Sequence, residues 1–120
     1  MVVVLFGTNK RDDIDLEEYA ARNERMSELV QQIPGFLGIK GYVSEDGDRI
    51  SVARFESQDA LEQWRFQPEH VATQRLARRS YYESYWVQVC ETIRDYRWSA
   101  DAGYIENPVR AGSASSDSGA

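Results

Sequence analysis

The sequence predicts an α+β fold, the ferredoxin-like βαββαβ arrangement, in which two helices cover one face of a four-stranded antiparallel sheet. Three observations predict it. Apolar, β-branched runs and segments of helical periodicity follow one another in this order. Asp46-Gly47 separates the two central runs, which is typical of an antiparallel hairpin. The last run, from residue 84 to residue 98, carries large side chains at successive positions, as a strand apolar on both faces does.

The first strand and helix have clear boundaries. Residues 2–9 are β-branched and apolar, which favours a strand. Asp15 followed by Glu18 is an acidic variant of the capping box, and it marks the start of a helix. Apolar residues then recur at helical spacing until Pro34-Gly35 ends the helix. The chain therefore enters the hairpin strands, at 36–43 and 50–55, directly after this break.

A proline divides the second helical segment. Ser57 is a good N-cap, and the apolar stripe that follows predicts a short helix ending near Phe66. Pro68 lacks an N–H and clashes with a preceding helical turn, so we expect it to stand at the first position of a new helix. That helix is predicted to run to about Tyr82, and the long final strand follows it.

Length and composition indicate one domain and a polar tail. Residues 1–107 are enough for a single modest core. The segment 108–120 is small, polar and almost free of large apolar groups, so we expect a disordered C-terminal tail. The single cysteine, Cys90, excludes an internal disulfide and suits the cytoplasm; as part of a strand it is expected to be a small core residue.

Charge and hydropathy exclude two classes of partner. The net charge is −6, from 20 acidic against 14 basic residues, which argues against nucleic acid. No apolar run approaches the ~18 residues of a membrane span.

One histidine and one cysteine cannot supply a usual zinc site, so no metal site is predicted. Because the later strands are apolar on both faces, we expect a second copy to cover the sheet as a homodimer.

The chain resembles the antibiotic biosynthesis monooxygenase (ABM) family of the dimeric α+β barrel superfamily over about residues 1–98. The matching segments are Pro34–Gly38, Phe55–Ala60, Trp64, Pro68–His70 and the strand Tyr85–Trp98. The resemblance implies a homodimeric monooxygenase that binds a hydrophobic, aromatic or polycyclic small molecule between helices and sheet. In the cofactor-free mechanism of the family, the deprotonated substrate itself passes an electron to O2.

Two alternatives to this activity stay open. The heme-degrading members of the family resemble one another in an iron-binding histidine ten residues after a helical tryptophan. Gln74 stands ten residues after Trp64 here, and His70 only six, so His70 is not carried over as a heme ligand. The second alternative is a ligand-binding dimer without catalysis.

His70 is the candidate catalytic base, because a neutral imidazole at a helix start accepts a proton near pH 7. It is equally interpretable as a structural histidine. The predicted substrate-binding residues carry amide, indole or phenol groups that stack on or hydrogen-bond a planar ligand. They are Asn9, Trp64, Gln74, Tyr82 and Tyr85.

Overall fold

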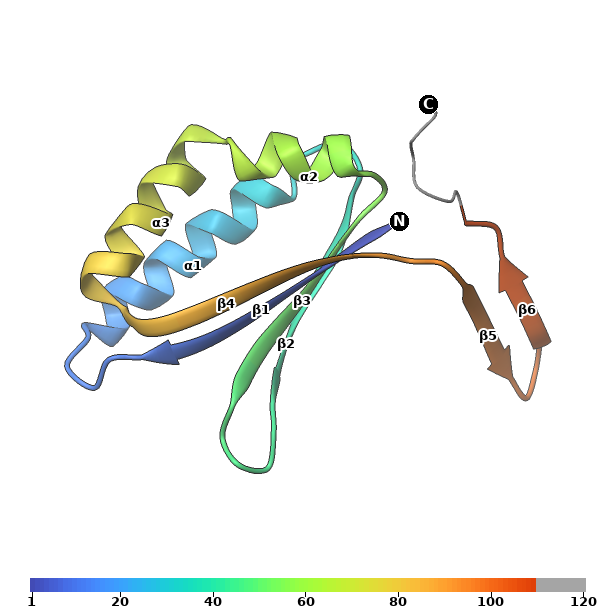
Figure 1. The fold of residues 1–120 in the computed structure, drawn as a ribbon, viewed down its shortest axis with the longest axis horizontal. Coiled ribbons are helices and arrows are strands. Elements are labelled where there is room, and N and C mark those ends of the chain that lie inside the picture. Colours follow the sequence, from blue (N-terminus) through green and yellow to red (C-terminus); the bar gives the residue numbers. More distant parts are fainter. Residues whose placement is uncertain (110–120) are drawn as a thin grey trace.

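A computed structural model describes residues 1–109 and confirms the ferredoxin-like fold. Its main sheet has four antiparallel strands in the order β2-β3-β1-β4, and the helices lie on one face of it (Figure 1). The elements up to residue 91 are β1 (Val2–Lys10), α1 (Leu16–Val30), β2 (Phe36–Val43), β3 (Arg49–Phe55), α2 (Gln58–Arg65), α3 (Pro68–Ser80) and β4 (Tyr82–Glu91).

The helices begin where the capping residues predict. An Asp15 carboxylate oxygen accepts a hydrogen bond from the Glu18 amide at 3.1 Å, and Ser57 Oγ accepts one from the Ala60 amide at 3.1 Å. Pro68 opens α3, as expected, and the side chain of Gln67 caps it. Each cap satisfies an amide that the first helical turn leaves without a partner.

The core lies between the helices and the face of the sheet that we call the inner face. Val30, Phe55 and Ala60 form its buried centre, and Val4 and Trp64 pack against it. Phe55 is only 1% exposed. Since directly paired residues of antiparallel strands share a face, every residue paired with this set also points toward the helices.

The opposite face, which we call the outer face, is uncovered in the single chain and carries large apolar side chains. Trp86 and Tyr42 are 47% and 51% exposed there, and Cys90 is exposed as well, so the prediction of Cys90 as a core residue is wrong for the single chain. Trp86 lies over Gly7, its partner on β1. The Trp86 ring can occupy this place because Gly7 has no side chain.

We expect Gly7→Ala to displace the Trp86 ring, because the added Cβ would lie 2.2 Å from it. The overpacking should destabilise the protein by about 1–3 kcal/mol. Urea unfolding followed by tryptophan fluorescence measures both the loss and the change around Trp86. Gly41→Ala is the matched control, since a Cβ there meets nothing within 4 Å. Equal stability of the two variants would contradict this account of Gly7.

The prediction of one long strand over residues 84–98 is wrong. The strand stops at Glu91, and β5 (Asp95–Ser99) pairs instead with β6 (Gly103–Asn107) as a separate hairpin (Figure 1). Glu91 pairs with Val2, the first residue of β1, and the Thr92 amide donates to the Met1 carbonyl at 2.9 Å, so the pairing ends where β1 begins. The predicted helix end at Tyr82 also moves, because α3 ends at Ser80.

Two further predictions concern the chain as a whole. The disordered tail was placed at residues 108–120, and its residues 110–120 lie outside the described part of the structure. Within the described part, no helix is long and apolar enough to cross a membrane.

Candidate functional site

His70 and Trp64 form a stacked pair at the start of α3. Their ring centroids are 4.0 Å apart and the rings are inclined by 15°. The Gln67 side chain accepts a hydrogen bond from the His70 amide at 2.7 Å. The break at Pro68 thus places the imidazole back over the last turn of α2. The structure brings together these two residues that the sequence singled out.

The hydrogen bonding of His70 sets its tautomer. Nδ1 lies 2.9 Å from the carbonyl oxygen of Trp64. A carbonyl only accepts, so Nδ1 carries the proton and donates it. In the neutral ring, the lone pair is therefore on Nε2. Burial lowers the pKa of His70, and the hydrogen bond to the Trp64 carbonyl opposes this shift only in part. The imidazole is neutral near pH 7.

The Nε2 atom of His70 has no hydrogen-bond partner among the described residues. Among the described residues, the only buried side-chain polar atom that lacks a hydrogen bond is Thr73 Oγ1. Nε2 is not among the buried atoms without a partner, so it keeps some contact with solvent although the residue is half-buried. A neutral imidazole nitrogen that is free and solvent-accessible is able to take a proton from a bound molecule.

An apolar surface on β4 extends along the helix side of the sheet. Val87 pairs with Phe6 and Val89 with Val4, so both point toward the helices, as does Tyr85. Yet Tyr85, Val87 and Val89 are 39%, 49% and 52% exposed. We call these three residues the uncovered strip. The helices therefore leave this edge of the inner face uncovered in the single chain.

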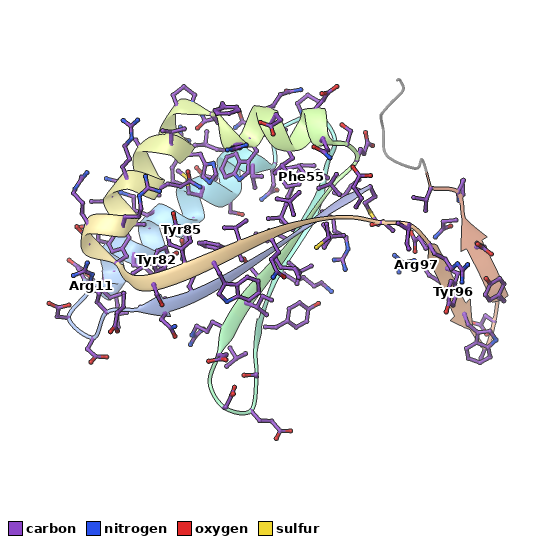
Figure 2. The ribbon with its side chains drawn as sticks, in the orientation of Figure 1. Arg11, Phe55, Tyr82, Tyr85, Tyr96 and Arg97 are labelled. Atoms are coloured by element: carbon purple, nitrogen blue, oxygen red, sulfur yellow. The ribbon has the colours of Figure 1, made fainter. Side chains whose placement is uncertain are left out.

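Tyr82 and Tyr85 belong to an aromatic cluster with Phe6, between α3 and the start of β4 (Figure 2). The Tyr85 hydroxyl accepts a hydrogen bond from Arg78 Nη1 at 3.0 Å. The Tyr82 hydroxyl lies 3.1 Å from that of Tyr19, and burial raises the pKa of Tyr82 well above its usual range. Eight residues of α3, or about 12 Å, separate Arg78 from His70. A ligand that touches both ends of α3 must therefore be elongated.

Asn9 lies apart from the stacked pair of Trp64 and His70. Its Nδ2 donates to Ser84 Oγ at 3.1 Å. It lines a hollow of about 360 Å³ that also includes Trp86, a residue of the outer face. The sheet separates Asn9 from His70 of the same chain. Gln74, one helical turn beyond His70, is exposed.

Sequence reasoning missed three residues that the structure places near the site. Gln67 caps α3 and Arg78 holds the Tyr85 hydroxyl. Thr73, three residues after His70, has the buried hydroxyl without a partner. Helical spacing was the available signal for Thr73. Arg78 stands in a group of three arginines with Arg75 and Arg79, and its charge does not distinguish it from them.

The residue at the position of the family's iron ligand does not fit heme. The position ten residues after Trp64 holds an exposed carboxamide, Gln74, which is a poor iron ligand. His70 lies flat against the Trp64 indole and is one turn nearer to it. Among the described residues, no three His, Cys, Asp or Glu side chains gather as they would around a metal ion.

The βαββαβ order and the antiparallel sheet with helices on one face define a small α+β protein of the ferredoxin-like class. The profile of the antibiotic biosynthesis monooxygenase family matches residues 8–76, more than half of the chain. The chain belongs to this family.

Three relatives show what the chain is similar to. The uncharacterized protein YqjZ of Bacillus subtilis (strain 168) is 40% identical over 76 residues, which are 63% of this chain and 67% of YqjZ. The structure of Rv0793 from Mycobacterium tuberculosis matches with a TM-score of 0.67 and 20% identity, over 78% of this chain and 96% of Rv0793. SnoaB, a cofactor-independent oxygenase from Streptomyces nogalater, matches with a TM-score of 0.63 and 14% identity, over 78% and 94%. These two structures show the shared fold.

Proposed function

We propose that the protein is a cofactor-independent monooxygenase that oxidises an aromatic or polycyclic small molecule, and that it works as a cytoplasmic homodimer. The observation that carries the proposal is His70, a neutral base with Nδ1 held by the Trp64 carbonyl and Nε2 free. Family membership and the fold shared with SnoaB, a cofactor-independent oxygenase, support the same reaction class. The single cysteine suits a reducing compartment.

The proposed reaction needs one base and an acidic C–H bond in the substrate. Nε2 of His70 takes the proton from a ring CH2 that is conjugated to a carbonyl, which leaves a carbanion. The carbanion transfers one electron to O2, and the two radicals combine into a peroxide. The peroxide loses its second C–H proton and its O–O bond breaks, so that CH2 and O2 yield C=O and water. The protein orients the substrate and shields it from solvent.

The other residues of the site would hold the substrate. The Trp64 ring stacks on one face of the imidazole. Tyr85 and the rest of the uncovered strip would form an apolar surface on which a planar ring packs. Tyr82 closes the far end, and the exposed Gln74 would contact a polar substituent at the rim. We propose no role for Asn9 in the pocket of its own chain, since it lies beyond the sheet.

The homodimer would form through the outer face. An antiparallel sheet with one wet face shows polar residues there, whereas Tyr42, Trp86 and Cys90 stand exposed on this one. The same apolar patch on two copies satisfies the self-complementarity of a two-fold interface. Light scattering of the purified chain at micromolar concentration measures the mass and tests this part separately.

Anthrone and its 1,8-dihydroxy derivative are suitable model substrates, because both carry an acidic ring CH2. We expect O2 uptake and quinone formation in equal amounts, saturating with substrate and unaffected by EDTA. Absorbance and an oxygen electrode measure them against the uncatalysed reaction. Saturable binding of both compounds with no acceleration would instead identify a ligand-binding dimer.

A further inference from the structure

The hairpin β5–β6, which we call the arm, has one aromatic face. Trp98 pairs with Tyr104 and Tyr96 with Glu106, so these four residues share a face. The rings of Tyr96 and Tyr104 lie 5.3 Å apart, and the Tyr104 hydroxyl donates to Glu106 at 2.9 Å. The other face carries mostly polar residues, among them Asp95, Arg97 and Asn107. An amphipathic hairpin of this kind has an apolar face that needs a cover.

Nothing in the described part of the chain supplies that cover. β5 pairs only with β6, and Trp98 is 71% exposed, with Tyr96 and Tyr104 at 55% and 57%. Figure 2 places Tyr96 and Arg97 on the arm, away from the sheet. A two-stranded hairpin is at best marginally stable alone in water. The arm therefore has the composition and the exposure of a segment that docks on another surface.

The position of the arm indicates on which surface it docks. Only residues 92–94 separate it from β4, the strand that carries Trp86 and Cys90 on the outer face. In Figure 1 the arm extends beyond the end of β4 and turns to the side of the sheet opposite the helices. A second copy seated on the outer face would lie on that same side, within reach of the arm.

We propose that the arm clasps a second copy of this chain, with Tyr96, Trp98 and Tyr104 packed on the partner. This inference rests on the homodimer proposed above and names a second element of its interface. It goes beyond the part of the chain that the ABM family profile matches, which ends at residue 76.

The available area favours a second copy over an unrelated protein. Large aromatic side chains bury about 150–250 Å² each, so the three exposed rings offer on the order of 400 Å² per arm. A specific interface buries about 800 Å² on each partner. One arm alone is too small, whereas in a two-fold dimer both arms add to the outer faces.

Charge disfavours an anionic membrane as the occupant. The chain has a net charge of −6, and the arm itself carries Asp95, Asp101 and Glu106 against one arginine, Arg97. Membrane-surface hairpins and helices bind anionic lipid through basic residues. The aromatic face is therefore more suited to protein than to lipid headgroups.

Photo-crosslinking of the full chain tests the clasp. p-Benzoylphenylalanine replaces Tyr96 on the aromatic face or, as the matched control, Arg97 on the opposite face. Unlabelled and 15N-labelled chains are co-refolded, irradiated and analysed by mass spectrometry. We expect crosslinks between heavy and light chains from position 96 and far fewer from position 97. Crosslinks from position 96 only within one chain, or equal yields from both positions, would overturn the proposal.

Sedimentation separates the clasp from the dimer itself. We expect Trp98→Ala and Tyr104→Ala each to raise the dimer dissociation constant at least tenfold without unfolding the chain, because the arm lies outside the core. An unchanged constant in a chain that is dimeric would overturn the clasp and leave the dimer standing. A chain monomeric at micromolar concentration would overturn both. Binding to phosphatidylserine vesicles that Trp98→Ala abolishes would assign the arm to a membrane and overturn the clasp.

Discussion

His70→Ala is expected to lower the rate of anthrone oxidation at least 100-fold, since a positioned general base contributes about 10²–10⁴ to a rate. The substitution removes Nε2, the only free imidazole nitrogen, from the site. It leaves the helix start intact, because Gln67 caps the backbone amide of residue 70 through its own side chain. Circular dichroism and light scattering check that fold and mass are unchanged.

Two control variants separate the base from its surroundings. His70→Gln keeps a donor for the Trp64 carbonyl and supplies no base, so it should be as inactive as His70→Ala. Arg75→Ala, an exposed change on the same helix, should keep the parental rate. Parental turnover in both His70 variants would remove His70 from the mechanism.

The pH profile provides a separate readout of the base. The folded-state pKa of His70 is lowered below its ordinary value of 6.5, so the imidazole is neutral above that lowered pKa and protonated below it. Activity should be constant near pH 7 and fall as the pH drops through the lowered pKa, with a midpoint below pH 6.5. Residual turnover in His70→Ala should lack this acid limb. The same limb in both proteins would mean that another group titrates.

Phe55→Ala is expected to lower the free energy of unfolding by about 3–5 kcal/mol, the range for truncating a buried phenylalanine. Phe55 is 1% exposed, and its ring packs edge-on against that of Phe36, with centroids 5.5 Å apart. Since the total free energy of unfolding of a native protein is only about 5–15 kcal/mol, a loss of this size brings the domain close to global unfolding. Urea denaturation followed by circular dichroism measures it.

Phe66→Ala is the matched control, because it makes the same change at a side chain that is 65% exposed. Its effect should stay within about 0.5 kcal/mol, as for most surface substitutions. If the two variants lose similar stability, the core is not centred on Phe55 as the structure places it.

Local signals predicted most of the elements, because they act over a few residues. The Asp15 and Ser57 caps, the turn at Asp46-Gly47 and the restart at Pro68 each depend on nearby backbone groups, and the structure has all of them. The apolar character of both faces of β4 was predicted for the same reason. Its end was not, because a strand continues only while a neighbour pairs with it, and β1 begins at Val2.

The candidate site was predicted in composition but not in arrangement. Trp64 and His70 lie close in sequence, and the proline break brings their rings together. Asn9 was expected beside them, yet side chains alternate between the two faces along β1, and Asn9 points to the outer face. For Thr73 the spacing from His70 is the one sequence signal, and Arg78 has none, since its contact depends on which surface it meets.

The sequence by itself determined the α+β order, the helix starts and the apolar character of both sheet faces, all of which follow from local propensity and periodicity. Only the tertiary structure decided the tautomer of His70, the exposure of the strip on β4 and the separate arm. Each of these depends on a distance between groups that different elements bring together, such as the 2.9 Å from His70 Nδ1 to the carbonyl at the end of α2. Such distances are set by packing, which no local pattern encodes.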